Sequence, residues 1–290
     1  MAVSTVLTDG LYFGEGPRWH EGRLWFSDFY AHAVKSVGAD GVQRVELEID
    51  DQPSGLGWLP DGRLLLVSMA EMKLLRLDAD GLKIHADLSE YSAHLCNDMV
   101  VDRQGRAWVG NFGFDLDALI EEKGVEDALA SHPATNLVRV DPDGSVHLAS
   151  PNMHFPNGTV ITPDGKTLIV AETLSMCLTA FDIEADGSLS NRRVWAEVGM
   201  RAPDGIALDE DGNVWVANAL AAECVLVTEG GEILQTVETS QPCFACMLGG
   251  EDGRTLHMVT AQSSDKSIAS AEAVGKIEVA RVDVAGAGCP

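Results

Sequence analysis

An oxygen-bearing side chain recurs at one position of a short repeated pattern. The stretches FGEGPRW, LCNDMVVD, FPNGTVIT and APDGIALD place Glu15, Asn97, Asn157 and Asp204 there, and two further stretches place Ser54 and Ala245 there. Asp-Gly and Asn-Gly pairs are common in turns, so each occurrence alone also fits an ordinary turn. The shared register of four stretches instead predicts that two carboxylates and up to two amides converge on a hard cation.

These donors indicate which cation to expect. Carboxylate and amide oxygens suit Ca²⁺ best, with Mg²⁺, Mn²⁺ or Zn²⁺ as alternatives. No thiolate or imidazole stands at the repeated position, which argues against a structural zinc site. The sequence therefore predicts one divalent cation per chain.

The elements that carry these residues also repeat. Six glycine turns, each followed by a short apolar strand, have their glycines at Gly22, Gly62, Gly105, Gly165, Gly212 and Gly253. A strand-rich period of about 40 to 50 residues is typical of a β-propeller with four strands per blade. A pair of β-sandwiches is the alternative, but it would not explain the fixed period. We expect one all-β domain over residues 1–290, a six-bladed β-propeller.

Two segments fall outside the period. The N-terminal stretch AVSTVL is expected to complete the last blade beside KIEVARVDV and so to close the ring. The interval from Gly105 to Gly165 is 60 residues long, and its excess spaces Leu116, Leu119, Ile120, Val125 and Leu129 as on one helix face. We expect a short helical insertion in blade three, over about residues 112–135, which is either a decoration or a lid over the channel.

A second set of polar residues ends the strands that follow the turns. Its members are Asp28, Ser68, Asn111, Glu172, Asn218 and Thr260. Because these strands run back toward the start of the preceding ones, both sets should lie at the same mouth of the channel. We therefore expect this second set either to support the metal ligands from behind or to form the substrate-binding wall, with Asn111 and Glu172 joining Asn97 in binding substrate.

Other reactive or aromatic residues stand close to these positions in the sequence. His94 and His154 each precede a predicted site amide by three residues and are expected either as acids or bases or as bystanders. Phe155, like Phe112 and Phe114, is expected to line an apolar pocket or to pack in the core. Cys243 and Cys246 have a C-x-x-C spacing, but without a second pair they do not predict a zinc ribbon.

Composition limits the function. The chain has 290 residues, 46% of them hydrophobic, and a net charge of −25, which argues against nucleic-acid binding because that needs Lys and Arg. The N-terminus does not read as a signal peptide, and no segment approaches the ~18 apolar residues of a membrane-spanning helix. The six Cys are therefore expected to stay reduced in a cytoplasm. The oligomeric state cannot be read from the sequence.

Together, the motifs GEGPRW, CNDMVVDRQGR, FPNGTVITPDGKTLIVAET and APDGIALDEDGNVWVANA resemble the senescence marker protein, gluconolactonase and luciferin-regenerating enzyme family over nearly the whole chain. The resemblance implies a six-bladed propeller with one metal, held by Glu15, Asn157 and Asp204. Asn97 would be a fourth ligand or a substrate contact. Regucalcin-like lactonases have a sugar-binding Arg two residues before this amide, where this chain has Leu95, which favours a less polar lactone.

The expected reaction is opening of a lactone by water at the metal. The cation would polarise the carbonyl and lower the pKa of a bound water, and Asp204 is the candidate base, with direct attack by its carboxylate as a covalent variant. The alternatives are hydrolysis of other electrophiles, such as organophosphate esters, and a non-enzymatic, calcium-binding propeller.

Overall fold

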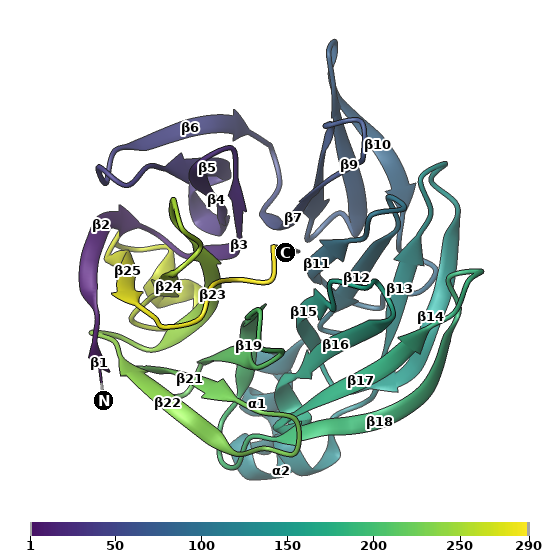
Figure 1. Ribbon diagram of the computed structural model, residues 1–290. Coiled ribbons are helices and arrows are strands. Elements are labelled where there is room, and N and C mark those ends of the chain that lie inside the picture. Colours follow the sequence, from purple (N-terminus) through teal and green to yellow (C-terminus); the bar gives the residue numbers. More distant parts are fainter. Residues whose placement is uncertain (1, 289–290) are drawn as a thin grey trace.

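The computed structural model describes residues 2–288, apart from the side chains at positions 125 and 126. The predicted contribution of Val125 to a helix face therefore lies outside the described side chains. Within this range the strands form six sheets arranged as blades around a central channel (Figure 1). The predicted six-bladed β-propeller is confirmed.

Each blade is a meander that starts at the channel and moves outward. Blades one to three comprise β3 (Gly14–His20), β4 (Arg23–Asp28), β5 (Ala33–Val37) and β6 (Gln43–Glu48); β7 (Pro53–Trp58), β8 (Leu64–Ser68), β9 (Lys73–Asp78) and β10 (Gly81–Asp87); and β11 (Cys96–Val101), β12 (Ala107–Asn111), β13 (Thr135–Val140) and β14 (Val146–Met153). The six predicted turn glycines all connect the first strand of a blade to the second, and each has a positive φ that a side chain would disfavour.

Blades four to six repeat this arrangement. They comprise β15 (Pro156–Ile161), β16 (Thr167–Glu172), β17 (Cys177–Ile183) and β18 (Leu189–Glu197); β19 (Pro203–Leu208), β20 (Val214–Asn218), β21 (Glu223–Val227) and β22 (Ile233–Glu238); and β23 (Cys243–Gly249), β24 (Thr255–Thr260), β25 (Gly275–Arg281) and the N-terminal β2 (Thr5–Leu11).

The N-terminal strand closes the ring, with one correction. β2 pairs antiparallel with β25, as predicted. The first residues of the predicted strand do not belong to that blade, because β1 (Ala2–Val3) pairs parallel with β22 of blade five. The chain crosses between the two blades at Ser4, whose amide donates to the Glu238 carbonyl at 3.0 Å. The outer strands of blades five and six are thus joined by one segment.

The excess length of blade three is helical. α1 (Leu116–Lys123) and α2 (Val125–Ser131) lie between β12 and β13, within the predicted range. The Asp115 side chain caps α1 by accepting from the Ala118 amide at 2.9 Å. Both helices lie behind the ring in the view of Figure 1, whereas the segment after β25 crosses toward the axis in front of it. A further short helix, α3 (Lys266–Ala269), follows β24 and had no counterpart in the prediction.

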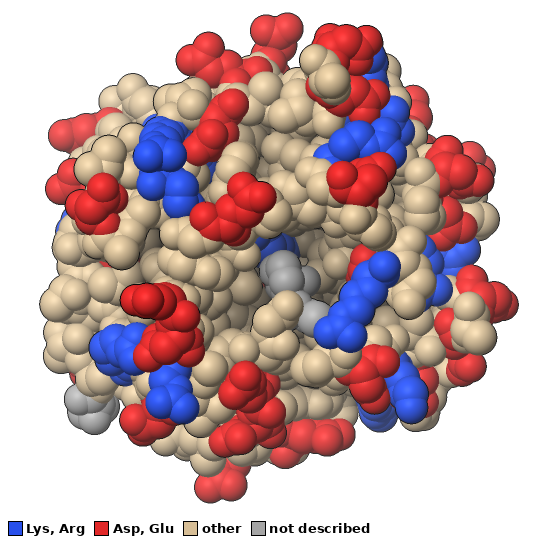
Figure 2. All heavy atoms as spheres, turned by 45° about the horizontal axis from the view of Figure 1, so that its top comes forward, with Lys and Arg blue, Asp and Glu red and all other residues tan. Residues whose placement is uncertain are grey.

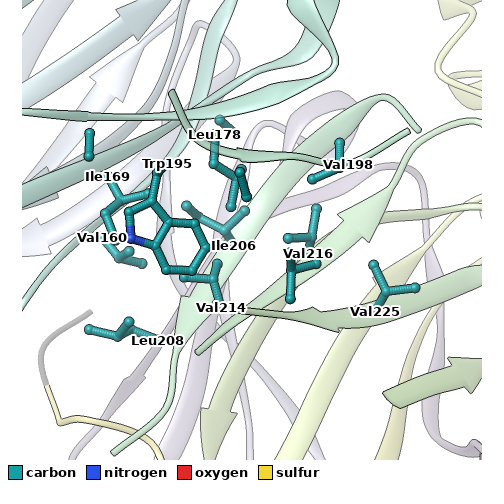
Figure 3. Packing of buried hydrophobic residues seen from close by; sticks show 14 residues of the cluster. Val160, Ile169, Leu178, Trp195, Val198, Ile206, Leu208, Val214, Val216 and Val225 are labelled. Carbon is teal, nitrogen blue, oxygen red and sulfur yellow. The ribbon is translucent and has the colours of Figure 1, made fainter. Parts of the chain in front are cut away.

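Apolar packing between neighbouring blades fixes their inner strands relative to one another. Between blades four and five, Trp195 of β18 packs in one cluster with Val160 of β15 and with Ile206 and Leu208 of β19 (Figure 3). Trp195 is only 6% exposed, and burying each of the aliphatic side chains packed against it contributes roughly 1.5–3 kcal/mol. This contact matters for the site because β15 carries Asn157 and β19 carries Asp204.

Among residues 2–288, no helix has the length and apolar character needed to cross a membrane.

Candidate metal centre

The repeated sequence position coincides with a repeated irregularity of the backbone. In each of the six inner strands the pairing register shifts near the start, between Glu15 and Arg18, Pro53 and Leu56, Cys96 and Met99, Pro156 and Thr159, Pro203 and Ile206, and Cys243 and Ala245. A bulge of this kind leaves an extra residue unpaired and re-aims its side chain. It explains why the polar residue recurs in one register, since each bulge turns the same position toward the channel.

Glycine follows several of these positions because the inner strands approach one another closely. A Cβ at Gly158 would lie 2.4 Å from the carbonyl oxygen of Asp204, and one at Gly55 would lie 2.4 Å from the amide nitrogen of Met99. Either contact is too short, so a side chain there would push neighbouring blades apart. The glycines thus keep the channel narrow enough for side chains of different blades to meet.

Four predicted site residues do meet at one end of the channel. Glu15, Asn97, Asn157 and Asp204 all line one cavity of about 340 Å³, and each is at most 7% exposed. The Asn97 amide Nδ2 donates to Asn157 Oδ1 at 2.8 Å, and Asn157 Nδ2 donates to Thr173 Oγ1 at 3.2 Å. These bonds fix the Asn157 carbonyl oxygen, which keeps a second lone pair for another partner.

The carboxylates are less well satisfied. Asp204 Oδ1 is buried and accepts no hydrogen bond from the described residues. Glu15 Oε2 accepts from the amide of Gly16 at 3.2 Å. An unpaired buried polar atom costs about 1–3 kcal/mol, and more if it is charged. The pair therefore has oxygen lone pairs directed at the cavity without sufficient donors.

Electrostatics concentrates negative charge at this point. Burial, followed by the charges of Asp204 and Asp98, raises the pKa of Glu15 well above its usual range. Burial and the Asp98 charge likewise raise the pKa of Asp204, against the hydrogen bond from Asn157. Burial also raises the pKa of Asp98, although Arg18 Nη2 contacts its Oδ1 at 2.9 Å. One guanidinium thus faces three buried carboxyl groups.

This donor set fits a divalent cation. A hard ion would supply the missing positive charge and a partner for Asp204 Oδ1, using the oxygen donors that Ca²⁺ and Mg²⁺ prefer. Within residues 2–288, no group of three or more His, Cys, Asp or Glu side chains is arranged to hold a metal. The candidate centre instead combines two carboxylates with two amides.

The second predicted ring does not face the cavity. Asn111 donates through Nδ2 to the Asn136 carbonyl at 2.7 Å and accepts from Thr135 Oγ1. Glu172 accepts from the His154 amide at 2.8 Å, from Thr179 Oγ1 at 2.5 Å and from Arg192 Nη2 at 3.0 Å.

The strand pairing explains this outcome. Glu172 pairs with Pro156, and Asn111 pairs with Cys96, so each lies opposite the residue before the predicted ligand. Directly opposed side chains share one face of a sheet and alternate with their neighbours. Glu172 and Asn111 therefore hold loops and outer strands in place and do not contribute to the cavity wall.

The two remaining predicted contacts lie in different places. Phe155 lines the cavity, with its ring centroid 4.3 Å from that of Phe112. His154 does not line it; its Nδ1 lies 2.9 Å from Nε2 of His132, at the end of the insertion, whereas the other candidate histidine, His94, does line the cavity. Leu116, Ile120 and Leu129 of the insertion do line the cavity. The helices thus lie at the same end of the channel as the candidate centre, where a lid was expected.

A larger cavity, of about 720 Å³, opens at the other end of the channel. It is lined by the far ends of inner strands, such as His20 and Trp58, and by Gly288, but by none of the four predicted site residues. Figure 2 shows this face of the molecule, where acidic and basic side chains are interleaved around a central hollow. Because the unsatisfied carboxylates lie at the opposite end, we place the candidate site in the smaller cavity.

The five cysteines within residues 2–288 are buried. Cys243 and Cys246 are free thiols at most 1% exposed, and burial raises the pKa of Cys243. A raised pKa disfavours the thiolate that would bind a metal or react. A core role fits this environment better than a zinc site.

Sequence reasoning missed the Arg18–Asp98 pair and Thr173. Arg18 stands inside GEGPRW, and Asp98 replaces the glycine that follows the ligand position in other blades. This replacement could have predicted the ion pair, because a charged residue at a position where neighbouring inner strands approach closely needs a partner of opposite charge. Thr173 Oγ1 donates to the Pro203 carbonyl at 2.8 Å and so links blades four and five beside the site.

Comparison with known families settles the relationship. The SMP-30/Gluconolactonase/LRE-like region family matches residues 13–262. The chain belongs to this family. It is 24% identical to a 6-deoxy-6-sulfogluconolactonase of Pseudomonas putida over 99% of this chain and 97% of that one. It is 25% identical to a diisopropyl-fluorophosphatase of Loligo vulgaris over 74% of each chain.

A solved structure shows the same fold. A calcium-binding regucalcin of Agrobacterium tumefaciens superposes with a TM-score of 0.80 at 21% identity, over 98% of this chain and 95% of that one. The names of the two enzyme relatives support a hydrolase.

Proposed function

We propose that this family member is a divalent-cation-dependent hydrolase that opens a lactone at the metal end of its channel. The observation that carries the proposal is the convergence of Glu15, Asn97, Asn157 and Asp204, all buried, on one cavity, with Asp204 Oδ1 unpartnered. A purely structural channel has no need for two uncompensated carboxylates, which cost free energy unless they are paired.

The proposed roles follow from the contacts. Glu15, Asn157 and Asp204 would hold the ion, with Ca²⁺ favoured and Mg²⁺, Mn²⁺ or Zn²⁺ as alternatives. When bound, a divalent cation supplies polarisation of the substrate carbonyl and stabilisation of its developing negative charge. Asn97 orients Asn157 through the 2.8 Å bond and presents its remaining polar groups to the ion or to the substrate.

Asp204 is the proposed base. Its Oδ1 accepts no hydrogen bond from the described residues, so one oxygen of the carboxylate can bind the cation while the other takes a proton from the attacking water. Glu15 keeps an amide donor and is assigned to cation binding alone. Direct attack by Asp204 would use the same atom, and the two mechanisms differ in whether an acyl group is transferred to the protein.

Hydrolysis of phosphate esters is the second candidate. It is favoured by the diisopropyl-fluorophosphatase relative, and the same oxygen ligands could serve either electrophile. A non-enzymatic, calcium-binding role is the third. The calcium-binding regucalcin with this fold supports an ion at the site but does not distinguish a hydrolase from a binding protein.

The insertion of blade three is the proposed lid. Three of its apolar side chains line the cavity, and the His132–His154 contact joins its end to the loop that leads into β15. Closure of such a segment would exclude bulk water from the substrate.

Turnover before and after metal removal tests the proposal. The purified protein is treated with a chelator, and hydrolysis of a panel of lactones and organophosphate esters is measured with and without added Ca²⁺, Mg²⁺, Mn²⁺ or Zn²⁺. We expect lactone hydrolysis that is lost on chelation and restored by a cation. Preference for the phosphate esters would select the second candidate, and binding of calcium without turnover of any ester would refute the enzymatic proposal.

A further inference from the structure

The wall of the metal-end cavity is strongly aromatic. Five phenylalanines from four blades line it: Phe13, Phe29, Phe112, Phe155 and Phe244. They form two groups, since the ring centroid of Phe13 lies 5.3 Å from that of Phe29 and 4.9 Å from that of Phe244, and Phe112 contacts Phe155. The carboxylates at the bottom of the cavity are thus flanked by apolar surfaces.

The apolar surface continues outward to the rim. Leu95, Leu174 and Met176 line the cavity beside the helices of the insertion, and Leu220 lines it while remaining 65% exposed. An exposed leucine alone needs no explanation, but one that borders an apolar cavity extends the surface a ligand would meet.

The charge on this wall has one sign. Among the described residues that line the cavity there is no Lys or Arg, whereas Asp115 and Asp117 near the lid add to the charges of Glu15 and Asp204. Arg18 is buried beyond this wall, where it pairs with Asp98. A bound divalent cation would offset the charges of Glu15 and Asp204, so in the cation-loaded enzyme the repulsion of an anionic ligand comes from Asp115 and Asp117.

Apolar side chains outnumber polar ones on this wall, and some of the polar ones are already bonded. Besides the four site residues, the polar lining residues are Tyr30, Gln52, His94, Asp115, Asp117, Thr173 and Ser264. Asp115 already caps α1, and Thr173 is bonded to Asn157 and Pro203. Hydroxyl groups buried against the phenylalanines would lose their hydrogen bonds to water without replacement.

We propose that this site selects uncharged lactones or esters with an alkyl or aryl substituent, and that it discriminates against sugar-acid lactones and anionic esters. The proposal rests on the hydrolase function proposed above and assigns its substrate class. The volume of about 340 Å³ lies at the lower end of the range for small-molecule sites, which suits a monocyclic lactone with a short substituent.

A homologous series of substrates tests the class. In the cation-loaded enzyme, kcat/KM is measured for γ-lactones with successively longer alkyl chains, for glucono-1,5-lactone and for a lactone bearing a carboxylate. We expect kcat/KM to rise about fourfold per methylene, from ~0.8 kcal/mol per buried CH₂ at 1.36 kcal/mol per tenfold change, until the cavity is filled. Equal or higher kcat/KM for glucono-1,5-lactone would overturn the proposal.

A charge variant at the rim tests the electrostatic part. Leu220→Arg, at an exposed position, should increase kcat/KM for the carboxylate-bearing lactone severalfold at low ionic strength, and added salt should remove the gain. Leu234→Arg is the matched control, because Leu234 is a half-exposed leucine on the outer strand β22 and makes the same change in net charge. If both variants change the kinetics equally, the selectivity does not come from the cavity wall.

A wall variant tests the aromatic part. Phe112→Leu should reduce the gain per methylene and lower kcat/KM for aryl substrates more than for the unsubstituted ring. Phe181→Leu, at a buried phenylalanine outside the cavity, is the control for general loss of packing. Cation-dependent turnover without preference for apolar substrates would overturn this inference alone, whereas absence of cation-dependent turnover on every ester would overturn the hydrolase function as well.

Discussion

Replacing Asp204 by asparagine separates the two roles proposed for this residue. Asp204→Asn keeps the shape and one oxygen but removes the negative charge and the basicity. The site is 7% exposed and its Oδ1 is unpartnered, so the substitution also removes a buried charge that the metal-free protein does not compensate. We therefore expect a more stable metal-free protein and a weaker cation site.

The expected changes in stability follow from the coupling between cation binding and folding. A ligand present at 100 times its dissociation constant stabilises the folded state by about 2.7 kcal/mol, and a tenfold loss of affinity removes about 1.4 kcal/mol of that gain. At roughly 2–4 °C per kcal/mol for a chain of slightly smaller size, the calcium-induced rise in Tm should shrink by several degrees. At saturating cation, turnover should fall by roughly 10²-fold or more if proton transfer to Asp204 is lost.

The assay combines thermal unfolding, with chelator and with calcium, and kcat at saturating cation. Asp164→Asn is the matched control, because Asp164 stands in an identical Pro-Asp-Gly sequence but is exposed in a hairpin turn. Asn157→Asp adds charge at the site and should hold the cation at least as well without creating a base. If fully loaded Asp204→Asn turned over lactone at nearly the wild-type rate, Asp204 would be a ligand only, and the base would have to be sought elsewhere.

Three further predictions concern pH, the ring closure and the lid. With chelator present, the stability of the protein should rise as pH falls from 7 toward 5. The folded-state pKa values of Glu15 and Asp204 lie above the ~4 of the unfolded chain, so the native state binds more protons. Thermal unfolding of the double variant Glu15→Gln/Asp204→Asn should show a weaker pH dependence, and an unchanged dependence would contradict the assignment. Burial works to raise the pKa of Glu278, but hydrogen bonds from the N-terminal segment and blade six hold it below its usual value. The Glu278 carboxylate therefore contributes to stability above about pH 4.3, and this contribution is lost as the pH falls through its lower folded-state pKa. Glu278→Gln should lower the free energy of unfolding by about 1–3 kcal/mol in denaturant unfolding at pH 7. An unchanged free energy of unfolding would show that this carboxylate does not secure the ring closure. Replacing the segment from Phe114 to Pro133 by a short Gly-Ser linker should change KM and substrate range with the circular dichroism of the sheets retained, and unchanged kinetics on several substrates would exclude a lid.

The fold and the first ring of the site could be predicted because both repeat. Turn glycines such as Gly62 and Gly212 mark the period, and Glu15, Asn157 and Asp204 keep one register relative to their turns. A repeated register predicts convergence on the axis without knowledge of any distance, because equivalent positions of a propeller are related by the same rotation.

The sequence could not decide between a supporting and a substrate-binding role for the second ring, because the orientation of its side chains depends on the bulge. The prediction that Glu172 returns to the same mouth is consistent with its pairing to Pro156, but the bulged neighbour Asn157 points the other way. A one-residue change in register inverts the face of a side chain, and sequence periodicity does not reveal where a bulge lies. The orientation of His154 could not be predicted either, because its side chain contacts His132, which only the folded insertion brings close to it.

Titration of the chelated protein with Ca²⁺ by isothermal calorimetry tests the central claim most directly. The account predicts one calcium per chain, with binding weakened at least tenfold in Glu15→Gln and in Asp204→Asn and unchanged in Asp164→Asn. Absence of stoichiometric binding of calcium or of any other divalent cation would contradict the metal centre, as would binding that all three substitutions leave unchanged.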